Sequence, residues 1–204
     1  MNRTIIIGTL ACIVGLMTAC NNQKRTDGGD KPTQEIVYND KIQNTFFGVP
    51  FGSTGEEVEA GFKKTGFYTN SNRTATTLFF EPYGADSKFS FGGLTWDYLR
   101  AQFSGDGIRN GGKFYSIQFC SAYKTKEAAL SDFNSVMNAL SNKYTLTKIN
   151  PTDTSTYKIY VGQTRNNQVI YVVCRSYESF GHERWIGVEL GYTDNNYNKV
   201  SDEL

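Results

Sequence analysis

The chain has 204 residues, with 21 Lys and Arg against 20 Asp and Glu, and a formal net charge of +1. A chain this close to neutral lacks the basic surface that attracts nucleic acids, so we expect no nucleic-acid partner. Aromatic residues make up 14% of the chain and prolines number only four. This balance favours strands and an ordered core over disorder.

Residues 1–19 are predicted to be a cleaved bacterial lipoprotein signal peptide. Arg3 supplies positive charge, and the apolar run Ile5–Leu16 follows it. This run is shorter than the roughly 20 residues that a membrane-spanning helix needs, and it fits the apolar segment of a signal peptide. The motif Leu-Met-Thr-Ala-Cys then ends at Cys20 and resembles the lipobox that lipoprotein signal peptidase cuts. The resemblance implies that Cys20 carries the lipid that attaches the protein to a membrane.

Residues 20–34 are predicted to form a flexible polar tether. The segment 21–31 contains no large apolar residue, so Cys20 heads a solvated stretch. This argues against the alternative, an ordinary secretory signal that ends in a cysteine by chance. Asn21 stands where an Asp would favour the inner membrane, by analogy with the lipoprotein class. We therefore expect a lipid-anchored protein of the bacterial cell envelope, in the outer membrane.

Residues 35–204 are predicted to form a single α+β domain made of two similar units, about 46–123 and 124–192, with a polar C-terminal tail. The first unit opens with a short strand, and a helix that ends near Thr65 follows. Ser53 and Glu56 are spaced as the capping box that begins such a helix. The strands expected after this helix are Thr76–Pro82, Lys88–Gly92, Thr95–Ser104 and Lys113–Tyr123.

The second unit begins with a helix that Thr125 caps and that ends near Tyr144. Its apolar residues recur at helical spacing. Three strands are expected after it: Thr156–Gln163, Gln168–Tyr177 and Arg184–Tyr192. A helix followed by consecutive strands, twice over, predicts an antiparallel sheet with two helices packed on one face, built as a tandem repeat of a helix-then-strands unit. The other face of the sheet would then be partly open to water.

A family resemblance adds to this pattern. The segment Phe47–Gly52 followed by Ser53–Val58 resembles the strand, glycine, cap and helix that open small envelope lipoproteins of the SmpA/OmlA (BamE-like) type. The doubled order of helix and strands looks like the architecture of the β-lactamase-inhibitor protein. The resemblance implies a small bacterial envelope lipoprotein of unknown function.

The sequence offers one candidate for acid–base catalysis, the single histidine His182, with Glu183 beside it. Neighbours on a strand point to opposite faces, so Glu183 is poorly placed to orient His182, and a polar loop is the favoured interpretation. A single histidine excludes zinc sites built from several histidines. No phosphate-binding or nucleophile-elbow motif is present. We therefore predict no catalytic residues, no metal and no cofactor, and we rank an enzyme centred on His182 lowest.

Two cysteines, Cys120 and Cys174, remain once the leader is removed and Cys20 is acylated. An oxidising compartment would allow a disulfide between them. The alternative is two separate buried thiols that pack as small apolar residues. The sequence leaves both open, because nothing shows that their strands are neighbours.

Six aromatic residues on or beside the predicted strands form the candidate binding surface. They are Trp96, Tyr98, Tyr160, Tyr171, Tyr177 and Trp185. On an open sheet face such rings bind a protein partner or stack on sugars, and we expect about a third of them to be exposed. The alternative is packing in the sheet core. The leading hypothesis is a non-catalytic interaction module that binds a protein partner, and the second is a glycan-binding accessory protein.

Overall fold

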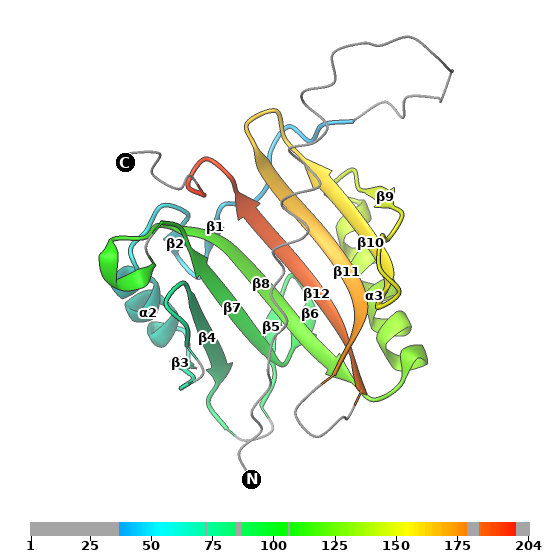
Figure 1. The fold of residues 1–204 in the computed structure, drawn as a ribbon, viewed down its shortest axis with the longest axis horizontal. Coiled ribbons are helices and arrows are strands. Elements are labelled where there is room, and N and C mark those ends of the chain that lie inside the picture. The colour runs from blue at the N-terminus through cyan, green and yellow to red at the C-terminus, as the bar shows by residue number, and fades with distance from the viewer. Residues whose placement is uncertain (1–36, 72, 85–86, 106, 179–183, 199–204) are drawn as a thin grey trace.

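A computed structural model describes residues 37–71, 73–84, 87–105, 107–178 and 184–198. Over these residues it has an eight-stranded antiparallel sheet and two α-helices, α2 (Gly55–Lys64) and α3 (Lys126–Ser141). The predicted α+β class is therefore confirmed (Figure 1). The signal peptide, Cys20 and the tether lie outside the described residues.

The main sheet joins two runs of consecutive antiparallel strands. Its strands in spatial order are β3 (Phe67–Thr69), β4 (Thr77–Pro82), β7 (Tyr98–Phe103), β8 (Phe114–Tyr123), β12 (Arg184–Asp194), β11 (Gln168–Glu178), β10 (Thr156–Gln163) and β9 (Thr147–Ile149). The first run ends at β8 and the second at β12, and these two long strands pair at the centre of the sheet. Each run follows one helix in the chain, as expected. The tandem repeat itself stays a prediction.

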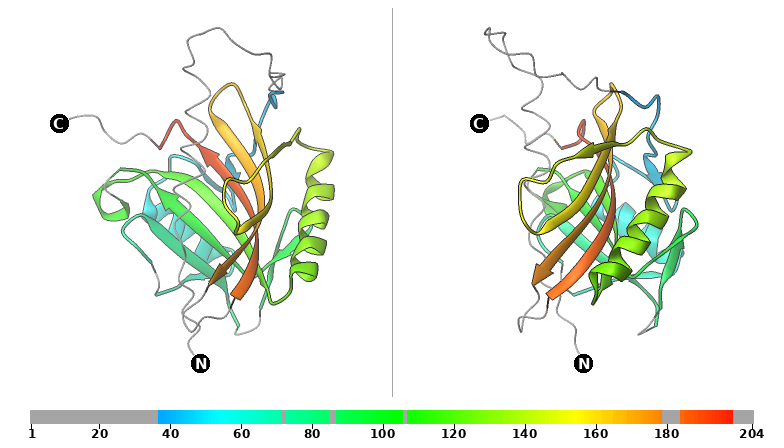
Figure 2. Two further views of the ribbon diagram at one scale, coloured as in Figure 1. Left: turned by 45° about the vertical axis from the view of Figure 1, so that its right-hand side comes forward. Right: turned by 90° about the vertical axis from the view of Figure 1, so that its right-hand side faces the viewer.

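Both helices lie on the same face of the sheet, one under each half (Figures 1 and 2). Two small hairpins lie on that side as well: β1–β2 (Thr45–Phe46 and Val49–Pro50) and β5–β6 (Phe89–Phe91 and Leu94–Trp96). We call this side the helix-covered face. We call the opposite side the helix-free face, because none of the described helices lies on it.

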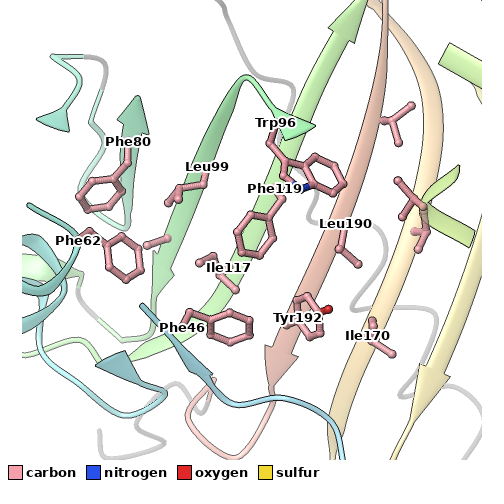
Figure 3. Packing of buried hydrophobic residues seen from close by; sticks show 14 of the residues in the cluster. Phe46, Phe62, Phe80, Trp96, Leu99, Ile117, Phe119, Ile170, Leu190 and Tyr192 are labelled. Carbon is pink, nitrogen blue, oxygen red and sulfur yellow. The ribbon is translucent and has the colours of Figure 1, made fainter. Parts of the chain in front are cut away.

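The helix-covered face contains the main hydrophobic core (Figure 3). Phe119 on β8 is fully buried at its centre and stacks on Phe91, with ring centroids 4.0 Å apart. The ring of Phe46, from the first hairpin, lies 6.1 Å from Phe119 and 5.0 Å from Tyr192. The two hairpins therefore fill the space on this face with aromatic rings from outside the main sheet.

Helix α2 begins one residue later than the sequence predicts. Thr54, not Ser53, is the N-cap, and its partner in the capping box is Glu57. The Thr54 hydroxyl accepts from the Glu57 backbone N–H at 3.3 Å, and the Thr54 N–H donates to the Glu57 carboxylate at 2.7 Å. The backbone carbonyl of Ser53 accepts from the Phe114 N–H at 2.8 Å. This bond ties Ser53 to β8, so the helix begins after it.

The other differences concern short or interrupted strands. The predicted strand Thr95–Ser104 is split at Asp97, whose carboxylate accepts from the Ala122 N–H at 2.9 Å. The strands β3 and β9 are absent from the prediction, and each has only three residues. The tail begins later than expected, because β12 continues to Asp194, which is buried. The strand Thr156–Gln163 was predicted with the bounds it has in the structure.

Candidate functional site

Strand register gathers polar side chains on the helix-free face. Arg100 on β7 pairs with Gln118 on β8, Gln118 pairs with Gly191 on β12, and Gly191 pairs with Tyr171 on β11. Directly paired residues share a face of the sheet. Four central strands therefore place Arg100, Gln118 and Tyr171 in one row, with a glycine between the last two.

A buried ion network lies beside this row. The Glu189 carboxylate on β12 accepts from Arg100 Nη2 at 2.9 Å through Oε2. Its Oε1 accepts from Nε and Nη2 of Arg175 at 3.1 and 3.0 Å. Arg100 and Glu189 are 3% and 4% exposed, so this pair is almost completely removed from solvent. Two cations share one carboxylate, which leaves the network with one excess positive charge.

Several polar atoms of the same row have no hydrogen-bond partner among the described residues. They are Nε2 and Oε1 of Gln118, Nε of Arg100 and the Tyr171 hydroxyl. Gln118 is only 1% exposed and Tyr171 only 3%. A buried unsatisfied polar group costs about 1–3 kcal/mol. Such groups are uncommon in native structures, so four atoms in one row are a distinctive feature of this face.

The pKa values of several titratable groups around this row are shifted. Burial raises the pKa of the Cys120 thiol to about 11. Burial likewise raises the pKa values of Tyr98 and Tyr171 well above the usual value for tyrosine. Burial works against the charge on Arg100, but Cys120 and Glu189 outweigh it, and the pKa of Arg100 is raised. The Cys120 thiol therefore stays protonated, and the two tyrosines stay neutral, near pH 7.

The two cysteines are free thiols on opposite faces of the sheet. Cys120 pairs with Glu189 on the helix-free face, whereas Cys174 pairs with Val188, the neighbouring residue of β12. Adjacent residues on a strand point to opposite sides. The sheet thus separates the two sulfur atoms, and the disulfide hypothesis is wrong for this structure.

The six predicted aromatic residues are divided between the two faces. Trp96 is fully buried on the helix-covered side, where its indole N–H donates to the Phe91 carbonyl at 3.3 Å. Tyr160 is on the same side, with its ring 6.0 Å from that of Phe133 on α3. These two rings belong to the core and not to a binding surface. Trp96 packs within its hairpin and against Phe119, and Tyr160 packs against α3.

The other four lie on the helix-free face by register: Tyr98, Tyr171, Tyr177 and Trp185. Tyr171 is buried, and the other three are partly exposed. The expectation that a third of the six would be exposed is wrong, because none exceeds partial exposure. The sheet nevertheless collects most of the predicted set on one surface.

Two of these tyrosines lie across glycines of the neighbouring strand. A Cβ at Gly191 would be 2.1 Å from Cζ of Tyr171, and one at Gly187 would be 2.9 Å from Cε1 of Tyr177. The glycines therefore leave room for the rings to lie over the sheet. Tyr177 also pairs directly with Trp185, whose ring centroid is 5.7 Å from the Lys124 ammonium.

The sequence alone does not predict the polar part of this site, which consists of Arg100, Gln118, Arg175 and Glu189. The available signal is a polar residue between apolar neighbours within a predicted strand, as for Gln118 between Ile117 and Phe119. That signal places each residue on the polar side of its own strand. It does not reveal that β8 pairs with β12, and this long-range pairing brings the four together.

The candidate catalytic residues His182 and Glu183 lie outside the described residues. Among the residues that are described, no group of three or more His, Cys, Asp or Glu side chains could hold a metal ion. No helix in the same part of the chain is both long and apolar enough to cross a membrane.

Comparison with known proteins finds no match for this chain among protein-family models, curated proteins or solved structures. The resemblance to the SmpA/OmlA and β-lactamase-inhibitor types therefore stays a prediction.

Proposed function

We propose that this protein is a lipid-anchored, non-catalytic binding protein of the bacterial envelope, and that its helix-free face is the binding surface. Cys20 would carry the lipid, and residues 20–34 would connect the anchored cysteine to the folded domain. The outer membrane is the expected location.

The observation that carries the binding function is the row of unpaired polar atoms on the helix-free face. Gln118 makes no hydrogen bond with either end of its amide, although it lies on a central strand of the sheet. Beside it, Glu189 is bonded to both Arg100 and Arg175, so the missing bonds are local to the row. A bound ligand would supply those bonds. Three partly exposed aromatic residues on the same face would enlarge the contact area.

The absence of a catalytic role is part of the proposal. The pKa shifts described above keep Cys120 protonated and the nearby tyrosines neutral at physiological pH. A general acid or base works best with a pKa near the working pH. A catalytic role for His182 remains the lowest-ranked alternative.

The binding function is tested with the full-length protein in its native membranes. After cross-linking in intact cells, the tagged protein is recovered, and the attached envelope protein and glycan are analysed by mass spectrometry. Tyr177→Ser and Trp185→Ser should each reduce the recovered material several-fold. Tyr157→Ser is the matched control, since Tyr157 is partly exposed and its ring lies 4.2 Å from the ammonium of Lys126 on α3, on the helix-covered side. Equal recovery from all variants would defeat the proposed surface.

A further inference from the structure

Three neighbouring strands and the start of the described chain meet at one end of the sheet. Strands β10 and β12 end there and β11 begins there, because Gln163 pairs with Val169 and Gln168 pairs with Asp194. The Asn39 N–H donates to the Gln163 carbonyl at 2.8 Å, which holds the first described residues at the same end (Figure 1). We call this end the N-terminal rim, and it consists of Val37–Lys41, Arg165–Asn167 and Asn195–Tyr197.

Ring and hydrogen-bond contacts join the parts of the N-terminal rim into one surface. The guanidinium of Arg165 lies 5.0 Å from the centre of the Tyr38 ring. The side-chain amide of Asn196 donates to the Asn166 carbonyl at 2.8 Å, which connects the end of β12 to the same turn. Tyr197 follows directly in the chain. The first described residues and the last ones therefore share this rim.

The N-terminal rim carries most of the exposed apolar surface. Five large hydrophobic side chains are exposed among the described residues, and three of them belong to the rim. These three are Val37, Tyr38 and Tyr197, with 52%, 39% and 41% of their surfaces exposed. Tyr83 is exposed at the opposite end of the sheet, because it follows β4, which begins level with Thr193 at the rim and runs away from it.

The residue types of the rim suit the surface of a phospholipid bilayer. Tyrosine is enriched where membrane meets water, since its ring is apolar and its hydroxyl is polar. The exposed cations of the rim, Arg165 and Lys41, outnumber its one exposed acid, Asp40. The neighbouring Asp194 is buried, and its carboxylate accepts from Asn196 at 2.8 Å. The exposed positive charge favours contact with lipid phosphate groups.

The chain that precedes the rim leads back to the proposed lipid anchor. Sixteen residues, 21–36, separate Cys20 from Val37. A flexible polar segment of that length has an average end-to-end distance of roughly 20–24 Å. A lipid on Cys20 would therefore keep the rim close to the bilayer. A contact that is weak by itself is then favoured, because the tether holds the rim at a high effective concentration near the lipid.

We propose that the N-terminal rim rests on the phospholipid surface of the membrane that holds Cys20, with Tyr38 and Tyr197 among the lipid headgroups. This inference rests on the lipid anchor of the proposed function and adds the orientation of the folded domain. Strands β10, β11 and β12 would then run away from the bilayer, so that the helix-free face points sideways and not toward the lipid. The competing arrangement is a domain that moves on its tether with no preferred orientation.

The test measures how close each end of the domain lies to lipid. The full-length protein, with its leader processed in the expressing cells, is reconstituted in vesicles of phosphatidylethanolamine and phosphatidylglycerol. Acyl chains brominated near the headgroup quench tryptophan fluorescence. Tyr38→Trp and Tyr197→Trp place probes at the rim, and Tyr83→Trp is the matched control at the other end. After subtraction of the emission from Trp96 and Trp185, bromolipid should reduce the added emission about twofold for both rim variants and leave the control unchanged.

Equal quenching at the two ends would overturn the inference. Quenching of Tyr38→Trp alone would overturn it as well, because only the start of the chain would then lie at the lipid. The circular dichroism spectrum and unfolding midpoint of each variant show whether it is folded. If Tyr197→Trp lowers the midpoint, Asn166→Trp replaces it as the second probe of the rim.

The intact mass of the protein and its flotation with vesicles report on the anchor separately. A chain that carries lipid and floats, but shows equal quenching at both ends, keeps the anchor and contradicts the orientation. A chain that carries no lipid and does not float contradicts both.

Discussion

The two faces of the sheet are built from the same strands but carry different kinds of buried side chain. On the helix-covered face, aromatic rings from the two hairpins and from Tyr192 on β12 converge on Phe119, which is fully buried. On the helix-free face, the neighbouring residues Gln118 and Cys120 stand beside an ion network. Successive residues of β8 therefore point alternately into the apolar core and toward the charged network.

The two faces contribute to stability in opposite ways. Burial of apolar side chains on the helix-covered face stabilises the fold, and each large side chain there contributes about 1.5–3 kcal/mol. Unpaired buried polar groups on the helix-free face lower the stability of the fold. A sequence that keeps such groups on central strands gives a less stable fold, and losses of stability of this kind are expected at functional sites.

The largest effect should come from the helix-covered face. Phe119→Ala removes the ring that stacks on Phe91 and should lower the free energy of unfolding by about 3–5 kcal/mol. Urea unfolding followed by fluorescence measures this change. Tyr83→Ala is the control, and because Tyr83 is 60% exposed we expect a change within about 0.5 kcal/mol. A similar small loss for Phe119→Ala would mean that this face is not the main source of stability.

The second effect tests whether the charges of the helix-free face depend on one another. Glu189→Gln leaves the buried Arg100 and its neighbour Arg175 without a counter-charge, and it should destabilise the fold by about 3 kcal/mol. Arg175→Gln is the matched variant. It should cost less, because 20% of the Arg175 side chain is exposed and Arg100 keeps its partner. The same urea titration compares the two, and equal losses would contradict a network centred on Glu189.

A third prediction uses pH to examine the helix-free face alone. Burial raises the pKa of Cys120 from 9.0 to about 11, so the folded state keeps the thiol proton that the unfolded state releases. Stability should therefore be fully present below pH 9 and fall as the pH rises through 11, by about 3 kcal/mol from this group. Cys120→Ala should lack this part of the loss. Identical pH profiles would show that the Cys120 thiol is not shielded from water.

Local patterns in the sequence predicted the elements, and long-range pairing decided the site. The apolar spacing of Phe133 and its neighbours, with the Thr125 cap, correctly predicted α3. The strand Thr156–Gln163 was found because it is long and alternates. The three-residue strands carry too little pattern to be found. Arg100 and Glu189 are 89 positions apart, and no local pattern reveals that a sheet brings them within 2.9 Å.

The smallest effect concerns the N-terminal cap of α2, one of the two helices on the helix-covered face. Thr54→Ala removes the hydroxyl that caps α2 and should cost about 1 kcal/mol. Ser53→Ala is the matched control at the position that the sequence favoured, and it should change stability by less than about 0.5 kcal/mol, because no side-chain bond of Ser53 caps the helix. Thermal unfolding of the two variants side by side measures the difference. A larger loss for Ser53→Ala would place the start of α2 one residue earlier, and with it the register of the helix against the sheet. Since Ser53 also bonds to β8 through its backbone, which alanine keeps, the comparison isolates the side-chain cap from the backbone link between the helix layer and the sheet.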